Sequence, residues 1–377
     1  SIDEVVELQK KNKWPTVGNV TTDVTDVFST FLWEGNSSTR NIQNGIDLTK
    51  GGLVWGKART QTYKHTLFDT ARGANKAISS NSTDAEVTET GVTAFNSNGF
   101  TLGTWAGLND NGEDFVGWTF RKASKFFDVV TYTGNGVNGR DIPHNLGVAP
   151  GMIIYKPLSA VGGDGSADAW WVDHRGLNAN KSLRLNSNVS EQSNQVYWTT
   201  RFDADNLNVS GNVNHNGINY VAYLFAHNNG DGEFGPDQDQ DIIKCGSYTG
   251  AGSTDVDVNL GFEPQWIMIK KSSADGDQWL MLDSMRGTVT GGGDSRLFAN
   301  LTNTEYGTND YLEFTSTGFR ITGTSGEVAT NGATYIYMAI RRGPLAAPTD
   351  ATKVFFVDSG TAANNVLSTG FNPDMSI

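Results

Sequence analysis

The chain has 377 residues, of which 37% are hydrophobic and 11% aromatic, so it can bury cores and does not have the composition of a disordered chain. Its formal net charge is −13, from 28 basic and 41 acidic side chains, and no cluster of Lys and Arg offsets the acidic excess. Nucleic acid and anionic membrane surfaces are therefore not expected partners, and without a run of about twenty apolar residues we expect no membrane insertion.

Residues 1–26 are expected to form a connecting strand or short helix that enters from something upstream of Ser1. They carry neither a basic region nor the apolar core of a signal peptide. The chain has one cysteine, Cys245, so an intrachain disulfide cannot form. This fits folding in a reducing cytoplasm, and the apolar context IIKCGSY predicts a buried strand residue rather than a reactive thiol.

Three copies of one pattern follow residue 26. Each opens with an apolar strand that ends in lysine: LVWGK (53–57), MIIYK (152–156) and WIMIK (266–270). A strand that runs into a turn comes next: LFDTARG (67–73), WWVDHRG (170–176) and WLMLDSMRG (279–287). Then comes a hairpin element, GFTLGT (99–104), DNLNVSG (205–211) and GFRITGT (318–324). Each copy closes with NGEDFVGWTF (111–120), NGINYVAYLF (216–225) or NGATYIYMAI (331–340).

The closing segments predict strands, because Asn-Gly is typical of a tight hairpin turn. After it, large apolar residues alternate with variable ones, as in Val116, Trp118 and Phe120. Such alternation predicts a strand with one face in a core and the other against a second sheet or water. We therefore predict an all-β fold of tandem β-sandwich, jelly-roll-like modules of about 100–115 residues.

The spacing of the copies sets the expected modules. Asp69, Asp173 and Asp283 lie 104 and 110 residues apart (173−69 and 283−173). The modules are expected at 27–123, 127–228 and 242–343, followed by the start of a truncated fourth repeat at 351–377. Because the last copy stops early, we expect the sequence to belong to a longer protein.

Several phrases resemble the repeat-bearing tail and structural proteins of marine bacteriophages, including cyanophages. They are FDTARGANKAISSNSTDAE (68–86), NSNGFTL (96–102), NGEDFVGWTFRKA (111–123), FDVVTYTGNG (127–136), HNLGVAPGMIIYK (144–156), YVAYLFAHN (220–228), IIKCGSYTGAGSTD (242–255), GFEPQWIMIKKS (261–272) and YIYMAIRRG (335–343). The resemblance implies a virion protein, assembled in the host cytoplasm and located in the tail or another external appendage.

The repeated Lys, Asp and Arg-Gly residues are the first candidates for chemistry. They are Lys57, Asp69, Arg72 and Gly73 in copy one, Lys156, Asp173, Arg175 and Gly176 in copy two, and Lys270, Asp283, Arg286 and Gly287 in copy three. The spacing from Asp to Arg changes between copies, which favours a turn whose Asp caps the backbone over an active site. We predict matching turns in which the three glycines have positive φ, and no catalytic residue.

Acidic residues between the second and third copies are weak candidates for binding Ca²⁺, namely Asp231, Glu233, Asp237, Asp239 and Asp241. The spacing does not match an EF-hand, so a solvated linker is the preferred interpretation, and no cofactor is predicted. The five histidines show no metal-ligand spacing of the HExxH kind.

Two aromatic pairs are candidates for binding a glycan or packing at an interface: Trp170 with Trp171, and Tyr197 with Trp198. Consecutive strand residues point to opposite faces, so we expect one member of each pair in a core and the other displayed. Packing against a neighbouring module or subunit is favoured over stacking on a sugar.

Together with the resemblance, these observations predict that the protein is a non-enzymatic structural component of a bacteriophage virion. It is expected to be a tail fibre or appendage whose modules serve host attachment. Alternatives are a carbohydrate-binding module that recognises host surface glycan, a capsid decoration protein and a hydrolase of surface glycans. Expected partners are other virion proteins and further copies of the chain. Exposed sheet edges favour a homo-oligomer, and the resemblance to fibres suggests a trimer.

Overall fold

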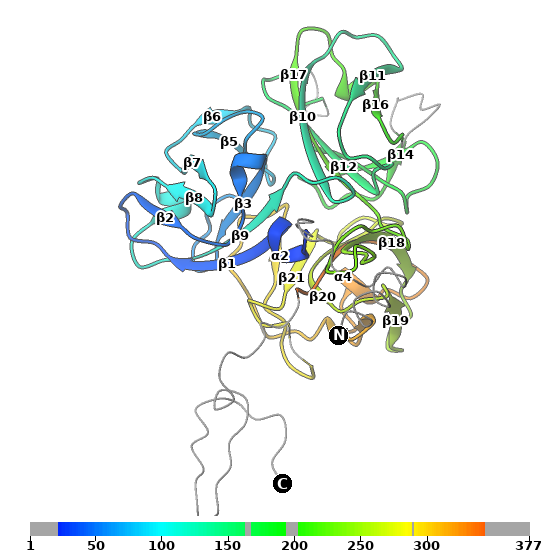
Figure 1. The fold of residues 1–377 in the computed structure, drawn as a ribbon. Helices are drawn as coiled ribbons and strands as arrows, with labels where there is room; N and C mark the ends of the chain where they lie inside the picture. Colours follow the sequence, from blue (N-terminus) through cyan, green and yellow to red (C-terminus); the bar gives the residue numbers. More distant parts are fainter. Residues whose placement is uncertain (1–21, 163–166, 194–202, 289, 344–377) are drawn as a thin grey trace, which may run out of the picture. The chain divides into compact units, whose positions relative to one another are not determined.

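A computed structural model describes residues 22–162, 167–193, 203–288 and 290–343 (Figure 1). These residues form an all-β fold of antiparallel sheets, and the predicted fold class is confirmed. Among them, no helix is long and apolar enough to cross a membrane. The helical turns are α2 (Val24–Val27), η1 (Leu48–Lys50), α3 (Ala106–Asn109), η2 (Gly211–Val213) and α4 (Gly326–Ala329). The predicted fourth repeat and the pair Tyr197 and Trp198 lie outside the described residues.

Each module contains one large sheet, and corresponding strands follow the same order. In the first module the order is β1 (Phe28–Glu34), β9 (Asp114–Arg121), β3 (Gly52–Ala58), β4 (Thr66–Asp69), β5 (Lys76–Ser79) and β6 (Val87–Thr88). In the second it is β10 (Phe127–Thr133), β17 (Asn219–Phe225), β12 (Met152–Pro157), β13 (Trp171–His174), β14 (Lys181–Arg184) and β15 (Gln192–Ser193). In the third it is β18 (Ile243–Thr249), β25 (Thr334–Arg341), β20 (Pro264–Lys271), β21 (Leu280–Asp283) and β22 (Leu297–Phe298).

Each module also contains a small antiparallel sheet. The small sheets are β2 (Arg40–Ile42), β8 (Gly99–Leu102) and β7 (Val92–Asn96); β11 (Arg140–Pro143) and β16 (Asn206–Val209); and β19 (Val256–Asn259), β24 (Gly318–Ile321) and β23 (Leu312–Thr315). In the first module, Val54 and Phe115 of the large sheet share a core with Phe100 and Leu102 of the small one. Burial of both apolar faces against each other makes the module a sandwich.

The other face of each large sheet contributes to a core that the modules share. On β25, Tyr335 and Tyr337 belong to the core of the third module, while Ile336, Met338 and Ile340 belong to the shared core. Successive side chains of the strand therefore point alternately into two cores, as the sequence predicts, and both faces of the strand are buried.

Phe120 lies where the three modules meet in the shared core. Its ring centroid is 5.4 Å from that of Phe225 in the second module and 6.0 Å from that of Trp266 in the third. Each large apolar side chain buried in this way contributes about 1.5–3 kcal/mol. The described residues up to Arg342 form one compact unit rather than three separate domains joined by linkers.

The chain enters the first module through α2, immediately before β1. Asp23 caps the helix by accepting from the Thr25 N–H, and the Asp26 carboxylate accepts from the Asp23 N–H at 2.7 Å. This reciprocal capping satisfies two amide donors at the first turn. Val24 and Val27 then pack into the shared core.

The strand register corrects the alignment of the second copy by one residue. Asp69 lies opposite Leu53 and Asp283 opposite Trp266, but the corresponding residue opposite Met152 is His174. His174, rather than Asp173, therefore occupies the position of the two aspartates.

The glycine prediction is right for two copies and wrong for the third. Gly73 and Gly287 have φ of 94° and 104°, whereas Gly176 is not in the left-handed region. The shortened turn of the second module places Gly176 beside the third module instead. A Cβ atom there would lie 3.2 Å from Ile336 Cγ2, so this glycine permits close approach.

Candidate functional site

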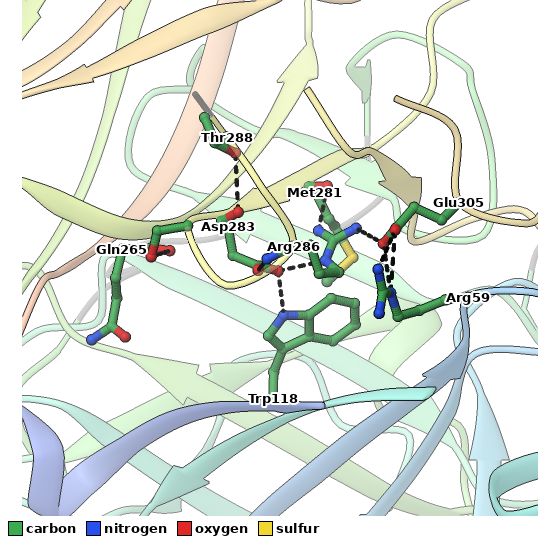
Figure 2. A network of polar contacts seen from close by, with 9 residues as sticks. Arg59, Trp118, Gln265, Met281, Asp283, Arg286, Thr288 and Glu305 are labelled. Carbon is green, nitrogen blue, oxygen red and sulfur yellow. Dashed lines mark hydrogen bonds and ion pairs between the residues drawn. The ribbon is translucent and has the colours of Figure 1, made fainter. Parts of the chain in front are cut away.

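A buried polar cluster lies where the third module meets the first (Figure 2). The Asp283 carboxylate accepts from the Arg286 backbone N–H at 2.9 Å and from Arg286 Nε at 2.6 Å. It also accepts from Trp118 Nε1 of β9 at 3.0 Å, so the indole crosses the junction. Asp283 is 0% exposed and Arg286 5%, and removing either member of such a pair costs about 3–5 kcal/mol because a buried charge loses its partner.

The turn after β21 holds Asp283 in place. Gly287 supplies the positive φ, and Thr288 Oγ1 donates to the Asp283 carbonyl at 3.1 Å. The Arg286 guanidinium folds back over the turn and donates to the Met281 carbonyl at 2.9 Å. The turn thus binds its own arginine through side chain and backbone, as a structural turn does.

Glu305 extends this cluster onto the first module. Its carboxylate accepts from Arg286 Nη1 at 3.2 Å and from both Nε and Nη2 of Arg59, the latter at 2.7 Å. Two-point contact between guanidinium and carboxylate is strong and directional. Glu305 therefore connects the turn of the third module to the chain that follows β3.

The second module meets the first through a corresponding cluster. Asp69 accepts from Arg72 Nε at 2.6 Å and from the Tyr223 hydroxyl of β17 at 2.7 Å. Glu86 accepts from Arg72 Nη1 at 3.2 Å. Burial alone lowers the pKa of Arg72, but the neighbouring Tyr223, Asp69 and Glu86 raise it above its ordinary value.

The third module meets the second at the corresponding place, but here a histidine replaces the buried aspartate. His174 Nδ1 accepts from the Gly176 N–H at 3.0 Å, and Nε2 lies 3.0 Å from the Tyr337 carbonyl. Since a carbonyl can only accept, Nε2 carries the proton. The residue corresponding to Trp118 and Tyr223 is Met338, which has no donor, so the backbone beside it provides the partner.

Backbone hydrogen bonds connect each module to the next. They run from the N–H of a glutamate to a carbonyl just after the lysine-bearing strand: Glu86 to Leu158 (3.0 Å), Glu191 to Ser272 (2.8 Å) and Glu305 to Arg59 (2.7 Å). The first leads from module one to two, the second from two to three, and the third from three back to one. The contacts therefore close a cycle within one chain.

The strand-end lysines also bind across two of the junctions. Lys156 Nζ donates to the Thr83 carbonyl at 2.9 Å, and Lys270 Nζ donates to the Asn188 carbonyl at 3.3 Å. Burial lowers the pKa of Lys156 and Lys270 to about 8. Both ammonium groups are used to hold a loop of the preceding module.

A pocket of about 300 Å³ opens at the junction of modules one and three. Its lining residues are Thr62, Arg296, Phe298, Asn303, Thr304 and Tyr306.

At this junction Lys57 departs from the pattern of the other two strand-end lysines, because its amine donates to the Ala58 and Gln61 carbonyls of its own module. The Lys57 ammonium, whose pKa burial lowers to about 8, therefore does not hold the loop of the third module.

The acidic segment holds a loop together. Both oxygens of Asp241 accept backbone N–H groups, from Gly230 at 2.8 Å and Gly232 at 3.0 Å. Glu233 accepts from Lys125 at 2.7 Å, and Asp231 accepts from the Asn229 N–H at 2.8 Å. Within the described ranges, no group of three or more His, Cys, Asp or Glu residues could hold a metal ion. Asp237 and Asp239 of the same segment are exposed.

The predicted aromatic pair Trp170 and Trp171 lies inside the protein. Trp170 is 0% exposed and its indole donates across the junction to the Ser79 carbonyl at 2.9 Å. Trp171 is 3% exposed and packs under Arg184, whose guanidinium carbon is 4.9 Å from the ring. The expectation that one member is displayed is wrong here, because the shared core buries the second face of the sheet.

The glutamates of the junctions were not among the residues predicted from the sequence. Glu86 follows Asp69 by 17 residues (86−69), and Glu191 follows His174 by 17 (191−174). Glu305 follows Asp283 by 22 (305−283), and this longer spacing hides the correspondence. Cys245, by contrast, is buried as predicted, and burial raises the pKa of its thiol.

Comparison with known proteins gives a family assignment. No curated protein matches the chain, and no solved structure matches it. A family model described as a domain of unknown function, DUF7483, matches residues 23–344. One model thus spans all three modules, as expected if they form one unit. The chain belongs to the DUF7483 family.

Proposed function

We propose that this chain is a non-catalytic structural protein of a bacteriophage particle, a segment of a tail fibre or tail appendage that contacts the host. Its three modules act as one stiff block, and an appendage that must hold a direction needs such stiffness. The phage-protein resemblance of the repeat phrases supplies the virion assignment.

The observation that carries the proposal is the use of the repeated polar residues. Asp69, Asp283, Lys156 and Lys270 are buried and hydrogen-bonded across module junctions. The buried Arg286 guanidinium packs over the Trp118 ring of the first module. Chemistry on a substrate needs reactive atoms that a substrate can reach, whereas these atoms are occupied by neighbouring modules. Assembly of the block therefore explains the recurrence of these residues, with Lys57 and Asp173 as the exceptions.

Mass spectrometry of purified particles tests the proposal directly, using the phage whose genome encodes the chain. The protein is expected in particles at a fixed copy number, with a major capsid protein as positive control and a replication enzyme as negative control. Antibody labelling of intact particles should then mark the tail. Absence of the protein from particles, despite its presence in the lysate, contradicts the proposal.

A further inference from the structure

Beside the pocket between modules one and three lies a strand bridge whose side chains differ from those at the other two junctions. Arg296 and Tyr306 form an isolated antiparallel bridge. The corresponding bridges pair Ala77 with Val87 and Ser182 with Gln192. The bridge recurs while its side chains change, so the backbone arrangement is common and the side chains at this pocket are particular to one junction.

Tyr306 offers an accessible aromatic ring beside the pocket. It is 51% exposed, and its backbone N–H donates to the Arg296 carbonyl. The Arg296 guanidinium carbon lies 5.2 Å from the Tyr306 ring, 4.7 Å from that of Phe298 and 5.5 Å from that of Tyr311. Packing against three aromatic rings fixes the guanidinium before a ligand arrives.

The network of Figure 2 holds the loop that carries these side chains. Glu305, next to Tyr306, is bonded to Arg59 through both its carboxylate and its backbone N–H. The pocket-lining residues Asn303 and Thr304 immediately precede it, and Thr62 of the first module lines the same pocket. A rigid, partly polar pocket with an aromatic wall is the geometry of a small-ligand site.

We propose that this pocket binds a neutral pyranose ring of a surface glycan, with Tyr306 stacked on its apolar face. This inference rests on the proposed host-contact function. Asn303, Thr304 and Thr62 supply hydroxyl and amide groups that match sugar hydroxyls. A neutral sugar is chosen because the charge of Arg296 already faces Glu327, 3.7 Å away, and the chain carries a net charge of −13.

Saturation-transfer NMR on the full chain tests the site with methyl pyranosides of glucose, galactose, mannose, rhamnose and N-acetylglucosamine, and with glucuronic and galacturonic acids. We expect at least one neutral pyranoside to bind. Tyr306→Ala should weaken that binding about tenfold, the size of one lost aromatic contact. Tyr306→Phe should retain most of it, because the ring remains.

Val87→Ala is the matched control, since Val87 occupies the corresponding bridge position and is 49% exposed. It should leave binding unchanged, and circular dichroism should verify that each variant is folded. No binding of any neutral sugar, equal loss in Val87→Ala, or tighter binding of the uronic acids overturns the inference. Presence of the protein in particles without sugar binding defeats only this inference; sugar binding by a protein absent from particles defeats only the proposed function.

Discussion

At the residue scale, the junctions use three different side chains at one position. Trp118 and Tyr223 donate to a buried aspartate of a neighbouring module, whereas Met338 packs beside a carbonyl that receives the bond from His174. Donor and acceptor change together. Where the acceptor is an aspartate carboxylate, the donor is a side chain, and where the donor is the ring N–H of His174, the acceptor is a backbone carbonyl. A buried polar atom without a partner is costly, which explains this pairing.

Tyr223→Phe removes the hydroxyl that donates to Asp69 at 2.7 Å, while Arg72 remains bonded to the carboxylate. We expect the free energy of unfolding to fall by about 1.5–3 kcal/mol, as for hydrogen bonds to charged groups. Met338→Leu is the control at the corresponding position and should cost less than about 1.5 kcal/mol. Urea denaturation measures both, and an unchanged midpoint for Tyr223→Phe contradicts the role of the bond.

The buried His65 makes the free energy of unfolding depend on pH. Burial lowers the pKa of His65 well below 6.5, and the nearby Lys57 and Arg286 lower it further. The unfolded chain therefore takes up a proton below pH 6.5 while the folded protein does not, so stability is lost as the pH falls. The loss from this group approaches about 1.4 kcal/mol per pH unit.

His65→Gln should make the free energy of unfolding less sensitive to acid. Urea denaturation of wild type and variant at several pH values between about 7 and 5 provides the comparison. The two curves should converge as the pH falls, because only the wild type loses this contribution. Parallel curves would show that His65 does not carry the effect.

At the element scale, the turns after β4 and β21 depend on a glycine. Gly73 has φ of 94°, and a Cβ atom at this position meets nothing within 4 Å. Gly73→Ala should therefore cost about 1 kcal/mol from backbone conformation alone. Gly73→Asn should cost less, since asparagine tolerates positive φ. Thermal denaturation separates the two variants, and equal melting temperatures for Ala and wild type would refute the argument.

The strands could be predicted from sequence because alternation and Asn-Gly turns are local signals. The one-residue shift at His174 could not, because WWVDHRG contains both an aspartate and an Arg-Gly pair that align well by eye. Only the pairing of Met152 with His174 reveals the shorter turn. The pocket was equally hidden, since Thr62 and Tyr306 come together through a junction between distant segments.

At the scale of the whole molecule, the shared core changes the expected role of oligomerisation. The sequence predicts that copies of the chain cover exposed sheet edges. The second face of each large sheet is covered by the other modules, as with Phe120 against Phe225 and Trp266. The homo-oligomer stays a prediction that rests on exposed sheet edges. The trimer stays a prediction that rests on the resemblance to fibres. Native mass spectrometry at micromolar concentration checks it, and a monomer there contradicts it.

We infer that the three sandwich modules fold as one unit through a closed cycle of junctions. Scanning calorimetry of the chain tests this most directly, because independent modules of about 100 residues melt separately, whereas one unit melts once. We predict a single transition whose calorimetric and van't Hoff enthalpies agree, and Tyr223→Phe should move the whole transition. Separate transitions, with only one displaced by Tyr223→Phe, would contradict the claim.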